Sequence, residues 1–129
     1  MSNRTDKDFL YDIQEAMRRI KTYTHEITYE EFLSDTRTQD AVIRNIEIIG
    51  EATKKLSVGL RNRYPSVPWK EIARTRDRLI HHYFGVDSDN FQFNNNLPLI
   101  SNFSNKFTPV SMNFSIPTPR VKVAASYHA

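Results

Sequence analysis

Three segments of the chain carry apolar residues every three or four positions, the period of one face of an α-helix. The first predicts a helix of about five turns that begins near Asp6 or Asp8. The second predicts the longest helix, and the third a helix from about Pro68 to Gly85. The apolar positions of the first two stripes are Phe9, Ile13, Ala16, Met17, Ile20 and Tyr23, and then Val42, Ile43, Ile46, Ile49, Ala52, Thr53 and Leu56.

Polar residues mark where these helices begin. Thr28-Tyr-Glu-Glu31 has the capping-box pattern, which predicts a short helix through Phe32 and Leu33, and Thr36-Arg-Thr-Gln39 repeats the pattern at the start of the longest helix. Gly59, Tyr64-Pro65 and Pro68 then interrupt the periodicity, and no alternating strand pattern occurs before Ser88. The first part of the chain is therefore predicted to be an all-α, up-and-down helical bundle.

The chain changes character at Ser88. Residues 88–129 hold only four of the 33 charged residues, together with seven asparagines and four of the six prolines. Such a composition is typical of irregular or disordered structure. We therefore expect one helical domain over residues 1–87 and an atypical tail over residues 88–129 that is disordered or partly helical.

Composition excludes several classes of site. The 129 residues suit one domain, and there is no cysteine for a disulfide or thiolate metal site. The four histidines have no acidic residues clustered around them, so we expect no metal and no cofactor. Neither a signal peptide nor an apolar run of about 20 residues is seen, which predicts a cytoplasmic protein without a membrane partner.

Positive charge gathers in one part of the sequence, although the net charge is only +3. Six basic residues and only two acidic ones lie between Arg61 and Arg78, and His81 and His82 follow. By contrast, Lys54 and Lys55 are expected to be solvated. Trp69 is expected to pack at the edge of the core or of a dimer, and direct stacking on a base is the less favoured alternative.

Arg76 and His81 lie about 140° apart around the last predicted helix, so they flank a shared groove over Ala73, Asp77 and Ile80. Arginine offers a permanent charge and a planar fork for phosphate, and histidine titrates near neutral pH. RNA cleavage without a metal needs these groups, because RNA supplies its own nucleophile. Asp77 could orient the ring of His81 or raise its pKa. The spacing alone is common by chance and seldom catalytic.

The segment from Tyr64 to Asp87 resembles the signature of HepT-like toxins, members of the HEPN superfamily of metal-independent ribonucleases. The resemblance rests on the motif Arg-x4-His-x-Tyr at Arg76, His81 and Tyr83, on the Pro-Trp before it and on Tyr-Phe-Gly-Val-Asp after it. The stretch Ile48-Ile-Gly-Glu-Ala52 is also similar to the second long helix of the family. The resemblance covers roughly residues 6–87, with a weaker echo at Asn96-Leu-Pro-Leu99.

The resemblance implies a homodimer that places two motifs around one cleft and cleaves RNA, leaving 2′,3′-cyclic phosphate. Arg76 and His81 would be catalytic, Asp77 supporting, and Arg74 and Arg78 would bind RNA. Such toxins are typically encoded beside an MNT-type nucleotidyltransferase antitoxin, which forms hetero-oligomers with them. This antitoxin would adenylylate Tyr83 and so exclude RNA.

Several alternatives stay open. The family continues into a last long helix after the motif, whereas this chain departs after Asp87. Arg61, Arg63 and Arg74 could follow the RNA backbone, bind an acidic antitoxin surface or be solvated. A non-catalytic module that docks a nucleotidyltransferase or a nucleotide would use Arg76 as a phosphate clamp and would not need His81. A helix-turn-helix DNA binder fits less well, because the apolar stripe runs through the residues that would enter the groove.

Overall fold

The computed structural model describes the backbone of residues 3–83 and 93–116, and the side chains of the same residues except 29, 78–83 and 93–101. These residues form helices and no strand, which confirms the all-α prediction. The helices are α1 (Asp6–Thr24), α2 (Tyr29–Ser34), α3 (Thr36–Lys55), α4 (Val58–Arg63), α5 (Trp69–Tyr83) and α6 (Phe93–Asn113). No described helix is long and apolar enough to cross a membrane.

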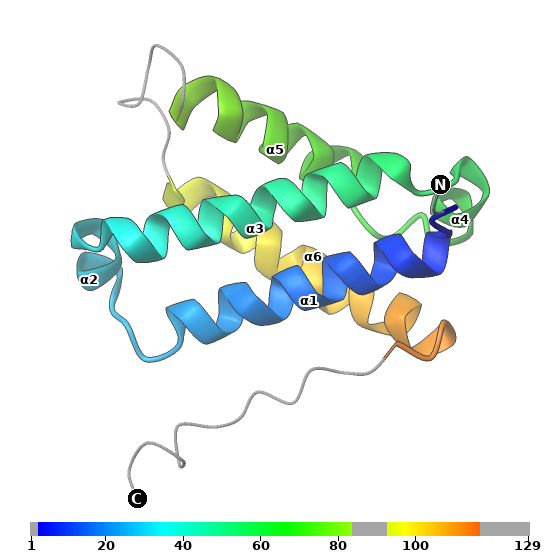
Figure 1. Cartoon of the computed structure of the whole chain (residues 1–129), viewed down its shortest axis with the longest axis horizontal. Helices are drawn as coiled ribbons and strands as arrows, with labels where there is room; N and C mark the ends of the chain where they lie inside the picture. Colours follow the sequence, from blue (N-terminus) through cyan, green and yellow to red (C-terminus); the bar gives the residue numbers. More distant parts are fainter. Residues whose placement is uncertain (1–2, 84–92, 117–129) are drawn as a thin grey trace, which may run out of the picture.

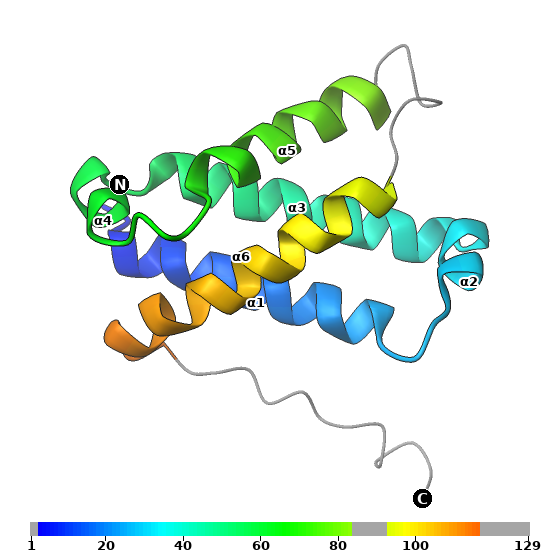
Figure 2. The ribbon, with the colours of Figure 1, turned by 180° about the vertical axis from the view of Figure 1, so that it is seen from behind.

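The three helices predicted from periodicity form one layer. Helices α1, α3 and α5 lie side by side and alternate in direction, with α3 in the middle, and the short helices α2 and α4 sit at opposite ends (Figure 1). Helix α6 crosses the back of this layer and contacts both α1 and α5 (Figure 2). The predicted up-and-down bundle is therefore present, with a crossing helix added to it.

Helix starts are set by short polar side chains. Thr5 and Asp8 form a complete capping box at α1, and Thr28 Oγ1 accepts a hydrogen bond from the Glu31 backbone N–H at 3.1 Å. The cap of α3 was predicted one residue too late. It is Asp35, whose Oδ1 accepts from the Thr38 N–H at 3.1 Å, because an aspartate immediately before the helix can reach the free backbone donors.

Most of the predicted apolar stripes are buried. All seven predicted positions of the second stripe are buried, including Leu56, which caps the end of α3, and so are four of the six in α1. Tyr23 was predicted to be part of the stripe but is 40% exposed, one residue before the end of α1. Leu10, fully buried, takes part instead, because its spacing to Ile13 and Met17 continues the same face.

Helix α4 was not predicted, because Gly59 and the following prolines were interpreted as breaks. Ser57 caps it by accepting from the Leu60 N–H at 3.1 Å, and Leu60 is buried. The Ser57 N–H and hydroxyl also donate to the carboxylate of Asp6, at 2.9 and 2.6 Å. These bonds fasten the start of α4 to the start of α1.

Residues 93–113 form α6, which lies within the tail that was expected to be disordered or partly helical. Phe103, Phe107 and Val110 are fully buried, and Phe103 and Phe107 stack with their centroids 5.5 Å apart. The helix escaped prediction because Pro109 lies inside it and because serines interrupt its apolar face. The boundary at residue 87 and the tail beyond residue 116 lie outside the described residues.

Candidate active site

The candidate site forms where α5 lies against α3, and a glycine permits this approach. A Cβ atom on Gly50 would lie 2.2 Å from Cβ and 2.6 Å from Cγ of Arg76, far inside contact distance. Gly50 is buried in the middle of α3, where glycine otherwise weakens a helix. The missing side chain therefore lets the stem of Arg76 pack directly on the backbone of α3.

Four charged side chains follow from this contact. Arg76 Nη2 lies 2.7 Å from Oε1 of Glu51 on α3, and Nη1 donates to Oδ1 of Asp77 at 3.0 Å. The same Asp77 oxygen accepts from Nζ of Lys54 at 2.7 Å. The charges alternate along this network, Glu51–Arg76–Asp77–Lys54, which joins α3 to α5 at two points.

The network holds the arginine in position. The Arg76 side chain is 26% exposed, so its guanidinium remains in reach of solvent while its stem is covered. Its Nε is buried and has no hydrogen-bond partner among the described residues. Hydrogen bonds from Lys54 and then Arg76 lower the pKa of Asp77, which keeps this carboxylate charged well into acid.

Not all predicted site residues can be compared with the structure. Arg76 and Asp77 do lie together, and Arg74 is exposed on α5. Positions 78, 81 and 83 lie on the continuous backbone of α5, but their side chains are outside the described residues. The roles given to His81, Tyr83 and Arg78, and that of Asp77 toward the histidine, stay predictions.

Three residues of the candidate site, Gly50, Glu51 and Lys54, were not recognised from the sequence. Gly50 and Glu51 lie within the Ile48-to-Ala52 stretch, which was noted only as a resemblance. Lys54 is exposed, in agreement with the prediction that it is solvated, but its pairing with Asp77 was not predicted. The available signal was their spacing, since Gly50 and Lys54 lie four apart and therefore on the same face of α3.

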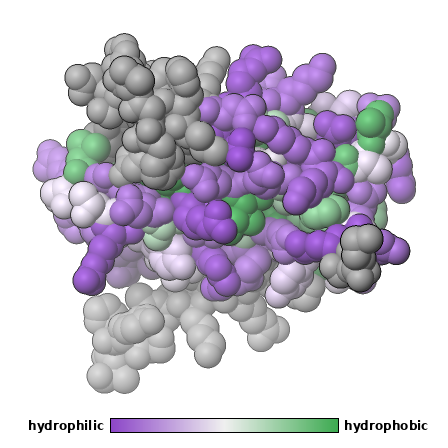
Figure 3. Space-filling view, turned by 45° about the horizontal axis from the view of Figure 1, so that its top comes forward, coloured by the Kyte–Doolittle hydropathy of each residue, from purple (hydrophilic) through white to green (hydrophobic). Residues whose placement is uncertain are grey.

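Arg76 also borders a groove of about 330 Å³ on its other side. The groove runs between α1 and α3 and is lined by charged residues of both signs, among them Arg4 and Lys55, which lie over the ring of Phe9, and Asp12, which pairs with Arg4. Figure 3 shows that hydrophilic side chains cover most of the face seen there. Among the described side chains no group of His, Cys, Asp and Glu could hold a metal ion.

Comparisons with known proteins identify the family of the chain. The sequence profile of the family described as "Ribonuclease HepT-like" matches residues 13–104. A Methanocaldococcus jannaschii protein named "Putative RNase" is 53% identical over 87 residues, which are 67% of this chain and 72% of the relative. A Thermococcus cleftensis protein named "Probable ribonuclease HepT" is 54% identical over 84 residues, 65% of this chain and 76% of the relative.

No solved structure matches the chain significantly. The family match covers more than half of the chain and includes α3, α5 and the contact between them. It also passes into α6, beyond the residues that carry the motif resemblance. The chain therefore belongs to the HepT-like ribonuclease family of HEPN proteins.

Proposed function

We propose that this protein is a metal-independent endoribonuclease in which Arg76 and His81 act on the phosphate of RNA. One observation carries the proposal. In a chain of the HepT-like family, the arginine of the Arg-x4-His-x-Tyr motif is held by Glu51 on a neighbouring helix, over a glycine that allows the approach. An arginine that is merely exposed to solvent on the protein surface does not need an ion pair that holds it in one position.

The chemistry follows from what RNA cleavage needs. A base removes the proton of the 2′-hydroxyl, whose oxygen attacks phosphorus, and the bond from phosphorus to the 5′-oxygen breaks as an acid protonates that oxygen. The products carry a 2′,3′-cyclic phosphate and a 5′-hydroxyl. Arg76 stabilises the negative charge that develops on the phosphorane. A homodimer supplies two copies of His81, one for the base and one for the acid.

The ion-pair network gives Asp77 a defined part in this proposal. The four charges of the network sum to zero, so nearby carboxylates balance the positive charge of Arg76 before RNA binds. Asp77 is half-exposed and shares one oxygen between two cations, whereas Glu51 holds the arginine from the α3 side. A phosphodiester that enters the site therefore replaces Asp77 at Arg76, while Glu51 keeps the guanidinium in place.

We further propose that the protein is the toxin of a toxin–antitoxin pair. Its partner would be an MNT-type nucleotidyltransferase that transfers AMP from ATP onto the hydroxyl of Tyr83, with release of pyrophosphate. Tyr83 lies seven positions after Arg76 on the same helix. The added phosphate carries a negative charge, and the nucleoside adds bulk, so both would exclude RNA from the cleft. This proposal is supported by the family and by the motif tyrosine.

The test is RNA cleavage in EDTA by the purified protein. A labelled tRNA pool is incubated with wild type, His81→Ala and the neighbouring His82→Ala, and the mass of the Tyr83-bearing peptide is recorded on the same batches. We expect cleavage with cyclic phosphate ends, its loss in His81→Ala, and its retention in His82→Ala. Failure of an unmodified wild-type protein to cleave would contradict the nuclease and favour a binding role.

A further inference from the structure

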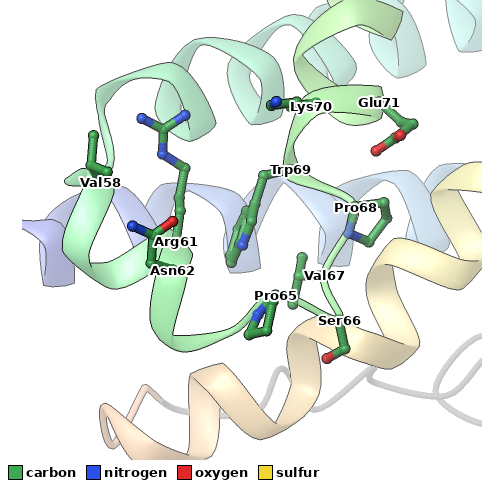
Figure 4. A pocket seen from close by; sticks show the side chains of 10 residues that line it. All are labelled: Val58, Arg61, Asn62, Pro65, Ser66, Val67, Pro68, Trp69, Lys70 and Glu71. Carbon is green, nitrogen blue, oxygen red and sulfur yellow. The ribbon is translucent and has the colours of Figure 1, made fainter.

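A second site lies between α4 and the start of α5, away from the ion-pair network. Here the chain encloses a cavity of about 570 Å³, which is within the size range of small-molecule sites. Apolar residues from different sides contribute to its lining, among them Val58, Pro65 and an edge of the indole of Trp69, which is 6% exposed (Figure 4). The cavity is larger than the groove beside Arg76 and shares no residue with it.

Two cations converge in this cavity. Arg61 from α4 and Lys70 from α5 project toward one another on the same side of Trp69, whereas Glu71 points away from them (Figure 4). Among the described residues neither cation pairs with a carboxylate. The Nε of Arg61 is moreover buried without a described hydrogen-bond partner. Two like charges that converge without an acid between them are suited to an anion.

The apolar part of the lining favours a nucleotide over inorganic phosphate as the bound anion. A phosphate alone would leave most of the cavity empty, whereas a nucleotide brings a flat ring that can lie against Trp69 and the prolines. The indole is held in place, because its Nε1 donates to the carbonyl of Tyr64 at 3.0 Å and its ring packs edge-on against Phe103. The ring therefore forms a fixed wall.

Helix α5 connects this cavity to the motif. Lys70 and Arg74 are exposed and four positions apart, so they lie on one face of α5, and position 81 falls on the same face of the backbone. Eleven positions at 1.5 Å each place residue 81 roughly 16 Å from residue 70 along the axis. A single strand of RNA can cover this distance.

We propose that the cavity binds one nucleotide of the RNA strand whose scissile phosphate lies at the motif. Arg61 and Lys70 hold its phosphate, and its base lies against the wall that contains Trp69. This inference rests on the proposed ribonuclease function for the identity of the strand. The cavity's capacity for a nucleotide does not depend on cleavage.

Trp69 is the only tryptophan of the chain, so its fluorescence reports on the cavity directly. The protein is titrated with AMP, with adenosine, which lacks the phosphate, and with inorganic phosphate. We expect AMP to give a saturable change and to bind more tightly than either fragment. Arg61→Gln and Lys70→Gln should each weaken AMP binding about tenfold, the usual effect of losing a charge-assisted hydrogen bond.

Arg63→Gln is the matched control, because Arg63 is exposed on the same short helix and does not line the cavity. It should change AMP affinity less than twofold. Far-UV circular dichroism of each variant shows whether it is folded, and Lys70→Gln keeps the test decisive if Arg61→Gln unfolds. A wild-type fluorescence signal that does not respond to AMP, or equal effects of Arg61→Gln and Arg63→Gln, would overturn the proposal.

A second measurement identifies the source of the nucleotide. A short RNA is added to His81→Ala protein that already holds AMP, and we expect the RNA to displace AMP from the cavity beside Trp69. The RNA should bind less tightly to the double variant His81→Ala, Arg61→Gln. AMP binding that RNA does not displace would overturn the assignment to the substrate strand. AMP binding and RNA displacement in a protein that cleaves no RNA would retain the cavity site and reject the nuclease.

Discussion

Helix α5 packs against two helices in two different ways. On α3 it rests partly on the buried Gly50 and partly on the ion pairs of Arg76 and Asp77, whose side chains are open to solvent. On α6 it rests through Trp69, whose ring meets Phe103 and Phe107 edge-on at 5.8 and 6.3 Å. Exposed ion pairs contribute little to stability, whereas buried aromatic rings contribute several kcal/mol. The aromatic rings on the α6 side therefore contribute more to stability than the exposed ion pairs on the α3 side do.

Loss of an aromatic ring on the α6 side should have the largest effect. Phe107 is fully buried, so Phe107→Ala should lower the free energy of unfolding by about 3–5 kcal/mol, measured by urea denaturation. Met112→Ala on the same helix should change it by less than about 0.5 kcal/mol, because Met112 is 68% exposed. A small loss in Phe107→Ala would mean that α6 does not build the core.

On the α3 side, loss of a side chain should lower activity strongly and stability only slightly. Arg76→Lys keeps the charge but loses the planar fork, so RNA cleavage should fall at least about 100-fold while the free energy of unfolding changes by less than about 1 kcal/mol. Cleavage rates and urea midpoints are measured on the same preparations. Arg74→Lys, on an exposed arginine two positions earlier, should retain activity within about fivefold. Full activity in Arg76→Lys would remove the arginine from the mechanism.

The close approach of α3 and α5 is tested at the two described glycines. Gly50→Ala should destabilise by about 1–3 kcal/mol and lower cleavage, because the new methyl group overlaps the stem of Arg76. Gly59→Ala in α4 meets no atom within 4 Å and should leave stability unchanged or raise it by up to about 1 kcal/mol. Thermal unfolding of both variants compares them. Equal behaviour of the two would show that α5 does not need the glycine.

The same contrast explains what the sequence could predict. The stripes of α1 and α3 were readable because burial against one partner leaves a regular period, as at Ile13 and Val42. Helix α6 was missed because its face combines Phe103 with buried Ser104 and Ser111, and its helical signal is interrupted by Pro109. Burial there depends on the helices it crosses, which a local pattern does not contain.

Some residues of the candidate site could likewise be identified from the sequence, and others could not. Arg76 and Asp77 were identified because they are neighbours within one motif. Glu51 and Lys54 were missed because they join the site only through the packing of α3 on α5, which sequence separation conceals. A glycine in the middle of a strongly periodic helix was the one local sign that another chain segment approaches there.

A variant that binds RNA more tightly would test whether Asp77 competes with phosphate for Arg76. Asp77→Asn raises the net charge of the network from zero to +1 and releases Arg76 from one of its two carboxylates. Affinity for RNA, measured in the His81→Ala background, should rise about fivefold, or about 1 kcal/mol for one charge close to the phosphate. Glu30→Gln on α2 serves as the carboxylate control, because Glu30 is exposed and does not belong to the network. Weaker binding by Asp77→Asn would mean that Asp77 does not compete with phosphate.

The smallest expected effect is the pH dependence of the same carboxylate. Lys54 and Arg76 lower the pKa of Asp77 in the folded protein, so its contribution to stability is present above the pKa of an unfolded aspartate, about 4. This contribution is lost as the pH falls through the folded pKa. Its size is small, because Asp77 is 53% exposed and solvent screens the pairs.

The measurement is the difference in unfolding free energy between wild type and Asp77→Asn across pH. Wild type should be slightly more stable at pH 7, and the difference should shrink as the pH falls below about 4, because a protonated Asp77 no longer pairs with Lys54 or Arg76. Phe107→Ala replaces a group that does not titrate, so its cost should stay constant over the same range. A constant difference for Asp77→Asn as well would mean that packing, and not charge, joins α5 to α3.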